Sequence, residues 1–254
     1  MTTESYTPGH SATSVAFMLR RSLTSHGQFF REFLQPGRTV LDCACGPGSI
    51  TLNIADAVSP AQVTGVDFQV SQIEEATGNA AARGTRNVRF LTASCYELPF
   101  AAESFDCVFS HALLEHLAQP GRAIAEFYRV LKPGGTLGVC SPDVGGLLVA
   151  PESPALKEAI FAYCAMQKNN GGDLEVGRHL GTLLLQAGFG AVQMSARFEC
   201  LIPSAISEYL GKQLEQAGQL AHARAFYEWS AKNSSSSSAG LYALPWVCAV
   251  GRKG

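Results

Sequence analysis

The stretch VLDCACGPGSIT, residues 40–51, holds the residue types with the most evident capacity for chemistry. Cys43 and Cys45 form a Cys-x-Cys pair, and thiolates at short spacing can bind a metal ion. Alternate residues of a strand, however, point to opposite faces, and no second pair with zinc spacing follows. We therefore predict that the two cysteines pack beneath a loop, and that the chain has no metal site.

The same stretch places small residues at alternate positions, Ala44, Gly46 and Gly48, between an apolar run and a helix that we expect to begin near Ser49. Small residues there let the backbone approach a ligand, and a helix N-terminus offers free N–H groups. The spacing differs from the Gly-x-Gly-x-x-Gly of dinucleotide sites. The preceding carboxylate, Asp42, favours a cofactor with a cationic amino group over one with a pyrophosphate.

A second carboxylate, Asp67, ends the next apolar run, GVDF. A carboxylate at this position of an α/β sheet can accept hydrogen bonds from both hydroxyls of a ribose. The pair of features indicates a nucleoside-containing ligand, and by itself does not separate one nucleotide cofactor from another.

The acid–base candidates lie in SHALLEHL, residues 110–117. His111 follows the end of an expected strand, where ligands gather in open α/β sheets, and a histidine can accept a proton near neutral pH. His116 is the second candidate. Two alternatives stay open: His111 as a pocket wall bonded to a backbone carbonyl, and Glu115 with His116 as a structural or pocket-forming pair. His10, near the N-terminus, is a further residue that could touch a substrate.

Short apolar runs alternate with helical patterns along the first 140 residues, which predicts a doubly wound, mostly parallel sheet. After a predicted N-terminal helix over 12–34, the expected strands are 39–43, 62–68, 88–92, 105–110 and 136–140, and the expected helices between them are 49–58, 71–84 and 121–131.

The pattern changes after Ser141. We expect a loop at 142–154, a helix at 155–166, a helix at 177–189 closed by Gly188, a strand at 191–198, helical structure over 204–232, a mobile loop at 233–240 and a last strand at 244–251.

Composition restricts the function class. The chain has 254 residues and a formal net charge of −2, so it lacks the basic surplus typical of a nucleic-acid binder. No stretch has the pattern of a signal peptide or the roughly 18 apolar residues of a membrane span. We therefore expect a cytoplasmic protein, with no nucleic-acid or membrane partner and with its eight cysteines reduced.

At the level of motifs, the chain resembles the class I S-adenosylmethionine-dependent methyltransferases. VLDCACGPG resembles the first motif of that family, GVDFQ resembles the second, and residues 88–137 resemble the rest of the core. The likeness is to the small-molecule branch that includes ubiquinone and menaquinone biosynthesis, and it covers most of residues 6–254. A combination of motifs is specific where each one alone is weak.

The resemblance implies a Rossmann-like, seven-stranded, mostly parallel sheet with a helical cap, and S-adenosyl-L-methionine as cofactor. It implies an N-terminal helical lid over 1–36 and a core over 37–254 with cap insertions at about 145–175 and 203–235. Carried over residue by residue, the cofactor-binding residues are Tyr6, Asp42, Ala44, Gly46, Gly48, Asp67, Phe68, Ser94, Cys95 and Ser110. Among them Phe68 would pack on adenine, Ser110 would lie beside the sulfonium and Tyr6 would close as a lid.

We therefore expect methyl transfer to a small, partly apolar molecule, by a monomer or homodimer. Methyl transfer is an in-line displacement that depends mainly on positioning. Two other classes stay open: a cofactor-binding protein without transfer activity, and an NAD-dependent oxidoreductase. Ala44 stands where the family has a glycine, and Ser94 where it has an aspartate.

Overall fold

The structure, a computed structural model, describes residues 5–9, 11–235 and 238–254. Within these residues eight strands form one sheet in the order β3-β2-β1-β4-β5-β10-β6, and β7 also pairs with β10. The strands are β1 Val40–Cys43, β2 Val63–Asp67, β3 Val88–Thr92, β4 Phe105–His111, β5 Leu131–Pro142, β6 Leu148–Ala150, β7 Gly190–Leu201 and β10 Leu241–Arg252. The predicted Rossmann-like fold class is confirmed, and the three-residue β6 is an addition to its seven strands.

Strands β1 to β5 are parallel, and β10 runs antiparallel to β5, β6 and β7. Alternating residues of the parallel strands feed two separate cores. Leu41 and Val108 pack with α5 (Pro120–Val130) and α7 (Leu180–Gln186), whereas Val40 and Phe109 pack with α3 (Ser49–Val58) and the N-terminal segment. This two-sided burial explains why the strands are apolar throughout instead of alternating. Helix α4 (Val70–Arg83) packs on β2 and β3.

The N-terminal segment is not the single helix that we predicted over 12–34. It forms α1 (Ala12–Leu19), α2 (Leu23–His26) and the 3₁₀ helix η1 (Gln28–Phe33). The break has a local cause, because Ser22 and Ser25 form a reciprocal capping box that begins α2. A serine in this position satisfies backbone N–H groups that a continuous helix would use itself.

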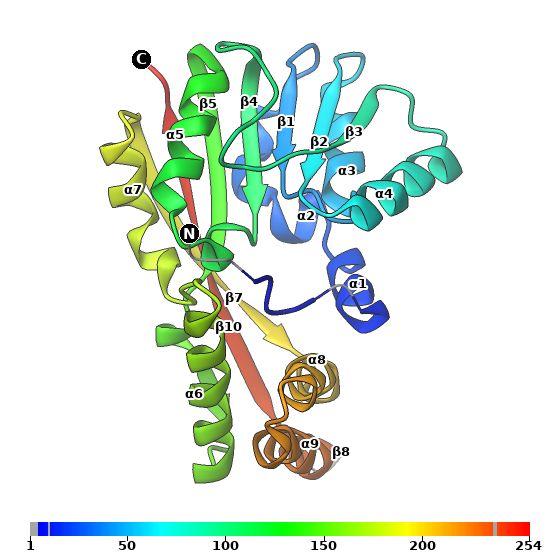
Figure 1. The fold of residues 1–254 in the computed structure, drawn as a ribbon, viewed down its shortest axis with the longest axis vertical. Helices are drawn as coiled ribbons and strands as arrows, with labels where there is room; N and C mark the ends of the chain where they lie inside the picture. The colour runs from blue at the N-terminus through cyan, green and yellow to red at the C-terminus, as the bar shows by residue number, and fades with distance from the viewer. Residues whose placement is uncertain (1–4, 10, 236–237) are drawn as a thin grey trace.

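A helical cap lies beyond the carboxyl ends of the parallel strands, and Figure 1 shows β7 and β10 continuing past those ends into it. The cap helices are α6 (Pro154–Asn169), α8 (Pro203–Gln216) and α9 (Leu220–Asn233). They bury one apolar cluster around Phe226 and Trp229, and the indole N–H of Trp229 donates to the carbonyl of Pro151 at 2.9 Å. The division of the chain into lid, core and cap stays a prediction.

Three further expectations differ in detail from the structure. The predicted loop at 142–154 contains the 3₁₀ helix η3 (Val144–Gly146) and strand β6, because β6 pairs with the start of β10. The predicted helix at 177–189 is η4 (Val176–His179) followed by α7. In the predicted mobile loop, β8 (Ser234–Ser235) pairs with β9 (Ser238–Ala239), and residues 236–237 lie outside the described part.

Among the described residues, no helix combines the length and apolar character required to cross a membrane.

The docking of the N-terminal segment gives a test of the fold. A methyl group at Gly138 in β5 would overlap the ring of Phe30, the fully buried anchor of η1. Because overpacking of this kind costs about 1–3 kcal/mol, we expect Gly138→Ala to lower the free energy of unfolding by that amount in urea titrations.

Gly78→Ala is the matched control, since Gly78 lies on the exposed side of α4 with open space around it. It should raise stability by about 0.5–1 kcal/mol. Equal stabilities of Gly138→Ala and the natural chain would contradict the close docking of Phe30.

Candidate active site

The loop between β1 and α3 has a backbone that favours small residues. Ala44, Gly46 and Gly48 all have positive φ, at 63°, 51° and 82°, and Gly48 caps α3. A methyl group on Gly48 would lie 3.1 Å from both the Ala76 side chain and the Phe90 ring. The loop is therefore pressed against α4 and β3, with Ala44 in a conformation that costs a non-glycine residue about 1–2 kcal/mol.

Asp67 holds this loop in place from the end of β2. Its carboxylate accepts from the backbone N–H of Gly46 at 2.9 Å and from that of Gln69 at 3.0 Å. The adjacent Phe68 is 74% exposed. A fixed carboxylate beside an exposed aromatic ring can hold a ribose and cover a planar base.

Asp42 lies beneath the loop and is almost fully buried. Its carboxyl accepts from the Thr51 hydroxyl at 2.6 Å. Burial, and to a lesser extent the neighbouring Asp67, raises the pKa of Asp42 to about 7, against the effect of Thr51. Two acidic groups thus flank the loop, an arrangement that suits a ligand with cationic groups.

Three further predicted cofactor residues lie at the ends of β3 and β4. Ser94 accepts from the backbone N–H of Tyr96 at 3.2 Å, and Cys95 follows it in the same turn. The buried Ser110 donates to the carbonyl of Cys43 at 2.9 Å, which ties the end of β4 to the end of β1. The proposed contacts of these three residues with a cofactor stay predictions.

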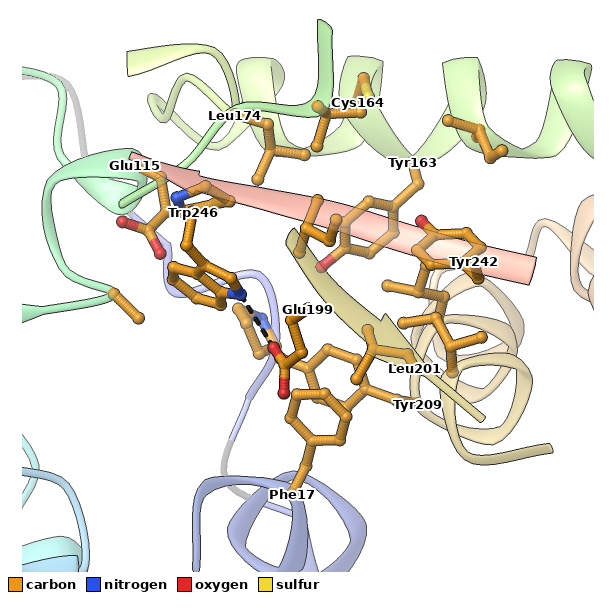
Figure 2. Close-up of a pocket in the computed structure, with 18 of the residues that line it drawn as sticks. Phe17, Glu115, Tyr163, Cys164, Leu174, Glu199, Leu201, Tyr209, Tyr242 and Trp246 are labelled. Carbon is orange, nitrogen blue, oxygen red and sulfur yellow. Dashed lines mark hydrogen bonds between the residues drawn. The ribbon is translucent and has the colours of Figure 1, made fainter. Parts of the chain in front are cut away.

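A cavity of about 80 Å³, room for several water molecules, opens between the cap and the strand ends. Its walls are mostly aromatic and aliphatic, with Tyr163 from α6, Tyr209 from α8, and Tyr242 and Trp246 from β10 (Figure 2). Tyr163 donates to the side-chain oxygen of Gln213 at 2.8 Å, so its hydroxyl is fixed. The cavity can therefore bind a small, largely apolar molecule.

Three charged side chains line the cavity, and sequence reasoning pointed only to Glu115, as a structural or pocket-forming partner of His116. They are Arg21, Glu115 and Glu199. The guanidinium of Arg21 lies over the rings of Phe17 and Trp246, at 5.8 Å and 5.3 Å from their centroids. Glu199 accepts from the indole N–H of Trp246 at 2.8 Å, as Figure 2 shows, and lies 3.3 Å from Nε2 of His26.

Glu115 is almost fully buried. Burial raises its pKa to about 7, against the hydrogen bond that Ser141 donates at 2.8 Å. Glu115 lies in the 3₁₀ helix η2 (Leu114–His116), at the end of the cavity beside Trp246 (Figure 2).

The two predicted catalytic histidines occupy different environments. His116 lines the cavity, and burial lowers its pKa to about 3. His111 is not among the lining residues, and its ring lies 4.5 Å from Trp246 and 5.1 Å from His26. Within the described structure neither ring nitrogen of His111 has a hydrogen-bond partner, and burial holds its pKa well below the usual range. A catalytic role for either histidine stays a prediction.

The N-terminal segment reaches both halves of the site. Tyr6 lines the cavity and packs edge-on against His116 at 4.7 Å, and burial raises its pKa. At the loop, the Ser49 hydroxyl donates to the carbonyl of Met18 at 3.3 Å. His10 lies outside the described residues.

The aromatic residues of the cap and of strands β7 and β10 differ in their position relative to the cavity. Tyr163, Tyr209 and Tyr242 line the cavity, Phe161 and Phe198 are exposed, and Phe226 and Trp229 belong to the cap core. Tyr227 is partly buried and packs against that core.

Cys43 is buried, and Cys45 lies in the loop with its sulfur 3.6 Å from the carbonyl of Gly46. Among the described residues, no three histidine, cysteine or acidic side chains gather in a way that could hold a metal ion.

Comparison with known proteins identifies the core. Residues 40–135 match the model of a family described as methyltransferase domain. The chain contains a class I methyltransferase domain. The matched residues of this domain run from the start of β1 to the start of β5, and they include Asp42, Asp67, Glu115 and His116.

Relatives of the methyltransferase domain support the same assignment. A demethylmenaquinone methyltransferase of Geobacillus stearothermophilus is 34% identical over 111 residues, 43% of this chain and 47% of its own. The structure of a putative methyltransferase of Bacillus halodurans has a TM-score of 0.66 at 19% identity, covering 89% of this chain and 97% of its own.

A phosphoethanolamine N-methyltransferase of Haemonchus contortus, in complex with S-adenosyl-L-methionine, has a TM-score of 0.59 at 20% identity. That match covers 89% of this chain and 51% of the other. The chain spans about half the length of the curated relatives that it matches.

The raised pKa values of Asp42 and Glu115 predict how the stability of the fold depends on pH. Between about pH 4 and 7 the folded chain keeps protons on Asp42 and Glu115 that the unfolded chain has lost, because both folded pKa values are near 7. The free energy of unfolding should therefore fall as pH rises through this window, by up to about 1.4 kcal/mol per pH unit for each group. Asp42→Asn, with its amide oxygen facing Thr51, should reduce the slope in urea titrations from pH 5 to 8.

Asp106→Asn serves as the control. The pKa of Asp106 is lowered by Lys132 and Thr39, so its contribution is lost only at more acidic pH. That variant should be less stable while its slope between pH 5 and 8 is unchanged. Identical slopes in Asp42→Asn and the natural chain would refute the assigned pKa of Asp42.

Proposed function

We propose that this protein transfers the methyl group of S-adenosyl-L-methionine to a small, partly apolar molecule. The observation that carries the proposal is the acidic setting of the loop after β1. The groups that shift the pKa of the buried Asp42 are a hydroxyl, Thr51, and a second carboxyl, Asp67. A cofactor with an ammonium group and a sulfonium supplies the positive charge that this setting favours, whereas a pyrophosphate would add negative charge.

The residues at the loop fit this cofactor. Asp42, with the positive-φ backbone of Ala44, Gly46 and Gly48, would hold its methionine part, and Asp67 would bind its ribose. When bound, the cofactor supplies a methyl group on a positively charged sulfur.

Four more residues complete the proposed cofactor site. The exposed ring of Phe68 would cover the adenine, with Ser94 and Cys95 at the base edge and Ser110 below the sulfonium. The chain's own task is to bind the two molecules, to orient them and to exclude water.

The acceptor binds in the cavity between cap and core. Its aromatic walls and few polar groups favour an acceptor with a planar or apolar body. The names of two relatives give very different acceptors, demethylmenaquinone and phosphoethanolamine, so the shared fold does not choose between them. A nucleic-acid acceptor is disfavoured by the net charge of −2. The cytoplasmic location and the monomeric or homodimeric state stay predictions from the sequence.

Calorimetric titration with S-adenosylmethionine, S-adenosylhomocysteine and NADH tests the cofactor. We expect micromolar binding of the first two and none of NADH. Binding of NADH alone would favour an oxidoreductase. Mass spectrometry of reactions with a panel of phenols, amines and thioethers then tests transfer. Binding without any methylated product from a broad panel would favour a cofactor-binding protein without activity.

Phe68→Ala isolates the cofactor contact from folding. Because the Phe68 ring is 74% exposed, its removal should leave the melting temperature nearly unchanged. Stacking of an aromatic side chain on a base contributes about 1–3 kcal/mol, so the dissociation constant for S-adenosylhomocysteine should rise roughly 5- to 150-fold.

The matched control is Phe161→Ala, which removes an aromatic ring that is 63% exposed on α6 and does not line the cavity. Its affinity for S-adenosylhomocysteine should equal that of the natural chain. Unchanged affinity in Phe68→Ala would remove Phe68 from the cofactor site.

A further inference from the structure

The hydrogen bonds around η2 determine which side chain of the cavity can accept a proton. The side-chain amide of Gln167, on α6, donates to the backbone carbonyl of Glu115 at 2.8 Å and lies 2.7 Å from Nδ1 of His116. A carbonyl can only accept, so the NH₂ group of Gln167, and not its oxygen, must face Glu115. Both amide hydrogens are then committed, one to the carbonyl and one to Nδ1.

This arrangement fixes the tautomer of His116. Because Nδ1 accepts from Gln167, the single proton of the neutral ring lies on Nε2. Nε2 in turn lies 3.7 Å from Oε1 of Glu115. His116 therefore presents a donor to Glu115 and has no free lone pair for a substrate, and its low pKa, about 3, agrees with a ring that stays neutral.

The packing leaves little freedom for another arrangement. The backbone N–H of Asp173 also donates to the Glu115 carbonyl, at 2.8 Å. A methyl group on Gly172 would overlap both that carbonyl and the amide nitrogen of Gln167. The side chains of Gln167 and Glu115 are both almost fully buried.

His111 offers no alternative base, because its ring packs against Trp246 and is not among the residues that line the cavity. Glu199 also lines the cavity, but against the effect of burial the hydrogen bonds from His26 and Trp246 hold its pKa below the usual range, which makes it the weaker base. Glu115 has one oxygen, Oε2, occupied by the Ser141 hydroxyl, and the other, Oε1, beside Nε2 of His116.

We infer that Glu115 is the group that receives a proton from the acceptor, and that the acceptor is therefore a hydroxyl or an amine that still carries a hydrogen on its reacting atom. This inference rests on the proposed methyl transfer and makes Glu115, and neither histidine, the base. His116 and Ser141 are positioning residues that act through Glu115.

The step balances in atoms and charge. The O–H or N–H bond of the acceptor breaks, its proton moves to the Glu115 carboxylate, and the electron pair of the oxygen or nitrogen forms the bond to the methyl carbon. The carbon–sulfur bond breaks with its electron pair on sulfur. One positive charge and one negative charge disappear together, which a buried site favours.

Several ionisable groups act on Glu115 in this position. Burial favours the neutral form and dominates, whereas a hydrogen bond with the backbone of Glu115 itself, the Ser141 hydroxyl and the charge of Arg21 favour the charged form. The other groups in electrostatic contact with it are His116 on η2, Tyr6 in the N-terminal segment, Tyr209 on α8 and Cys140 on β5. A carboxyl that titrates near neutrality is well matched to proton transfer at physiological pH.

The first test observes the protonation of Glu115 without any turnover. Because the buried Asp42 also has a pKa near 7, infrared difference spectra are recorded on Asp42→Asn, and between pH 5 and 9 they should contain one buried carboxylic acid band that titrates near pH 7. Each further substitution is made in that background. The band should be absent in Glu115→Gln and present in Glu208→Gln, a variant of an exposed glutamate on α8. Ser141→Ala, which removes a donor to the carboxylate, should move the midpoint to higher pH. A band with a midpoint below about pH 5, or one that survives in Glu115→Gln, would overturn the inference.

The second test uses the acceptors that the natural chain methylates. Glu115→Gln should lower kcat by about 10²–10⁴-fold at pH 8, with the affinity for S-adenosylhomocysteine preserved. The natural chain should have a pH-dependent limb, a decline of kcat toward acidic pH as Glu115 becomes protonated, and Glu115→Gln should lose this limb. His116→Asn should shift that limb and keep it. Loss of the limb in His116→Asn alone, or preferred methylation of thioethers and tertiary amines at a rate that Glu115→Gln leaves unchanged, would overturn the inference. A natural chain that binds the cofactor but methylates nothing would refute the transfer activity, and the infrared titration would still decide the protonation of Glu115.

Discussion

The antiparallel pairing of β10 with β7 is the interaction on which the site depends. The register runs from Tyr242 opposite Leu201 to Arg252 opposite Gly190. Residues 241–243 of β10 also pair with β6, and residues 246–252 pair with β5. One strand is thus shared by cap and core, and every backbone hydrogen bond along it fixes the position of the cap above the parallel strands.

Side chains of β10 show how this sharing shapes the cavity. Tyr242 belongs to the apolar cluster of the cap, whereas Ala249 belongs to the core beneath α5 and α7. Trp246 lies between them, at the cavity, where it contacts Arg21, His111 and Glu199. A shift of one residue in the pairing would turn Trp246 to the other face of the sheet and remove it from the cavity wall.

Patterns local in the sequence predicted the cofactor side of the site. Asp42 and Asp67 each end an apolar run, and parallel strands of one sheet place such ends together, so one motif locates each residue. The acceptor side could not be predicted in this way. Arg21, Glu115 and Glu199 come from segments far apart in the chain and line one cavity only in the folded protein. Gln167 has no sequence signal at all, since a polar residue in a helix is usually exposed.

The broken N-terminal helix also shows where apolar periodicity fails to predict the structure. The apolar residues of 12–34 fit a helical period, and the capping box of Ser22 and Ser25 overrides that period by offering the backbone other partners. The break matters for the site, because it turns the chain at Arg21 so that α1 packs over the loop after β1 while α2 and η1 pack on the sheet. Arg21 lies at this turn and reaches the cavity.

Cap and core divide the chemistry between them. The core provides Glu115 and His116 within the segment that matches the methyltransferase-domain family. The cap provides Gln167, whose amide determines which nitrogen of His116 carries the proton. A hydrophobic or acidic residue at position 167 would leave Nδ1 without a donor, and the ring could then present a lone pair from Nε2 to the cavity. Under the proposed mechanism, the residue at this position of α6 therefore selects between a histidine base and a glutamate base without any change in the core, which is a physical route by which one fold can serve acceptors of different acidity.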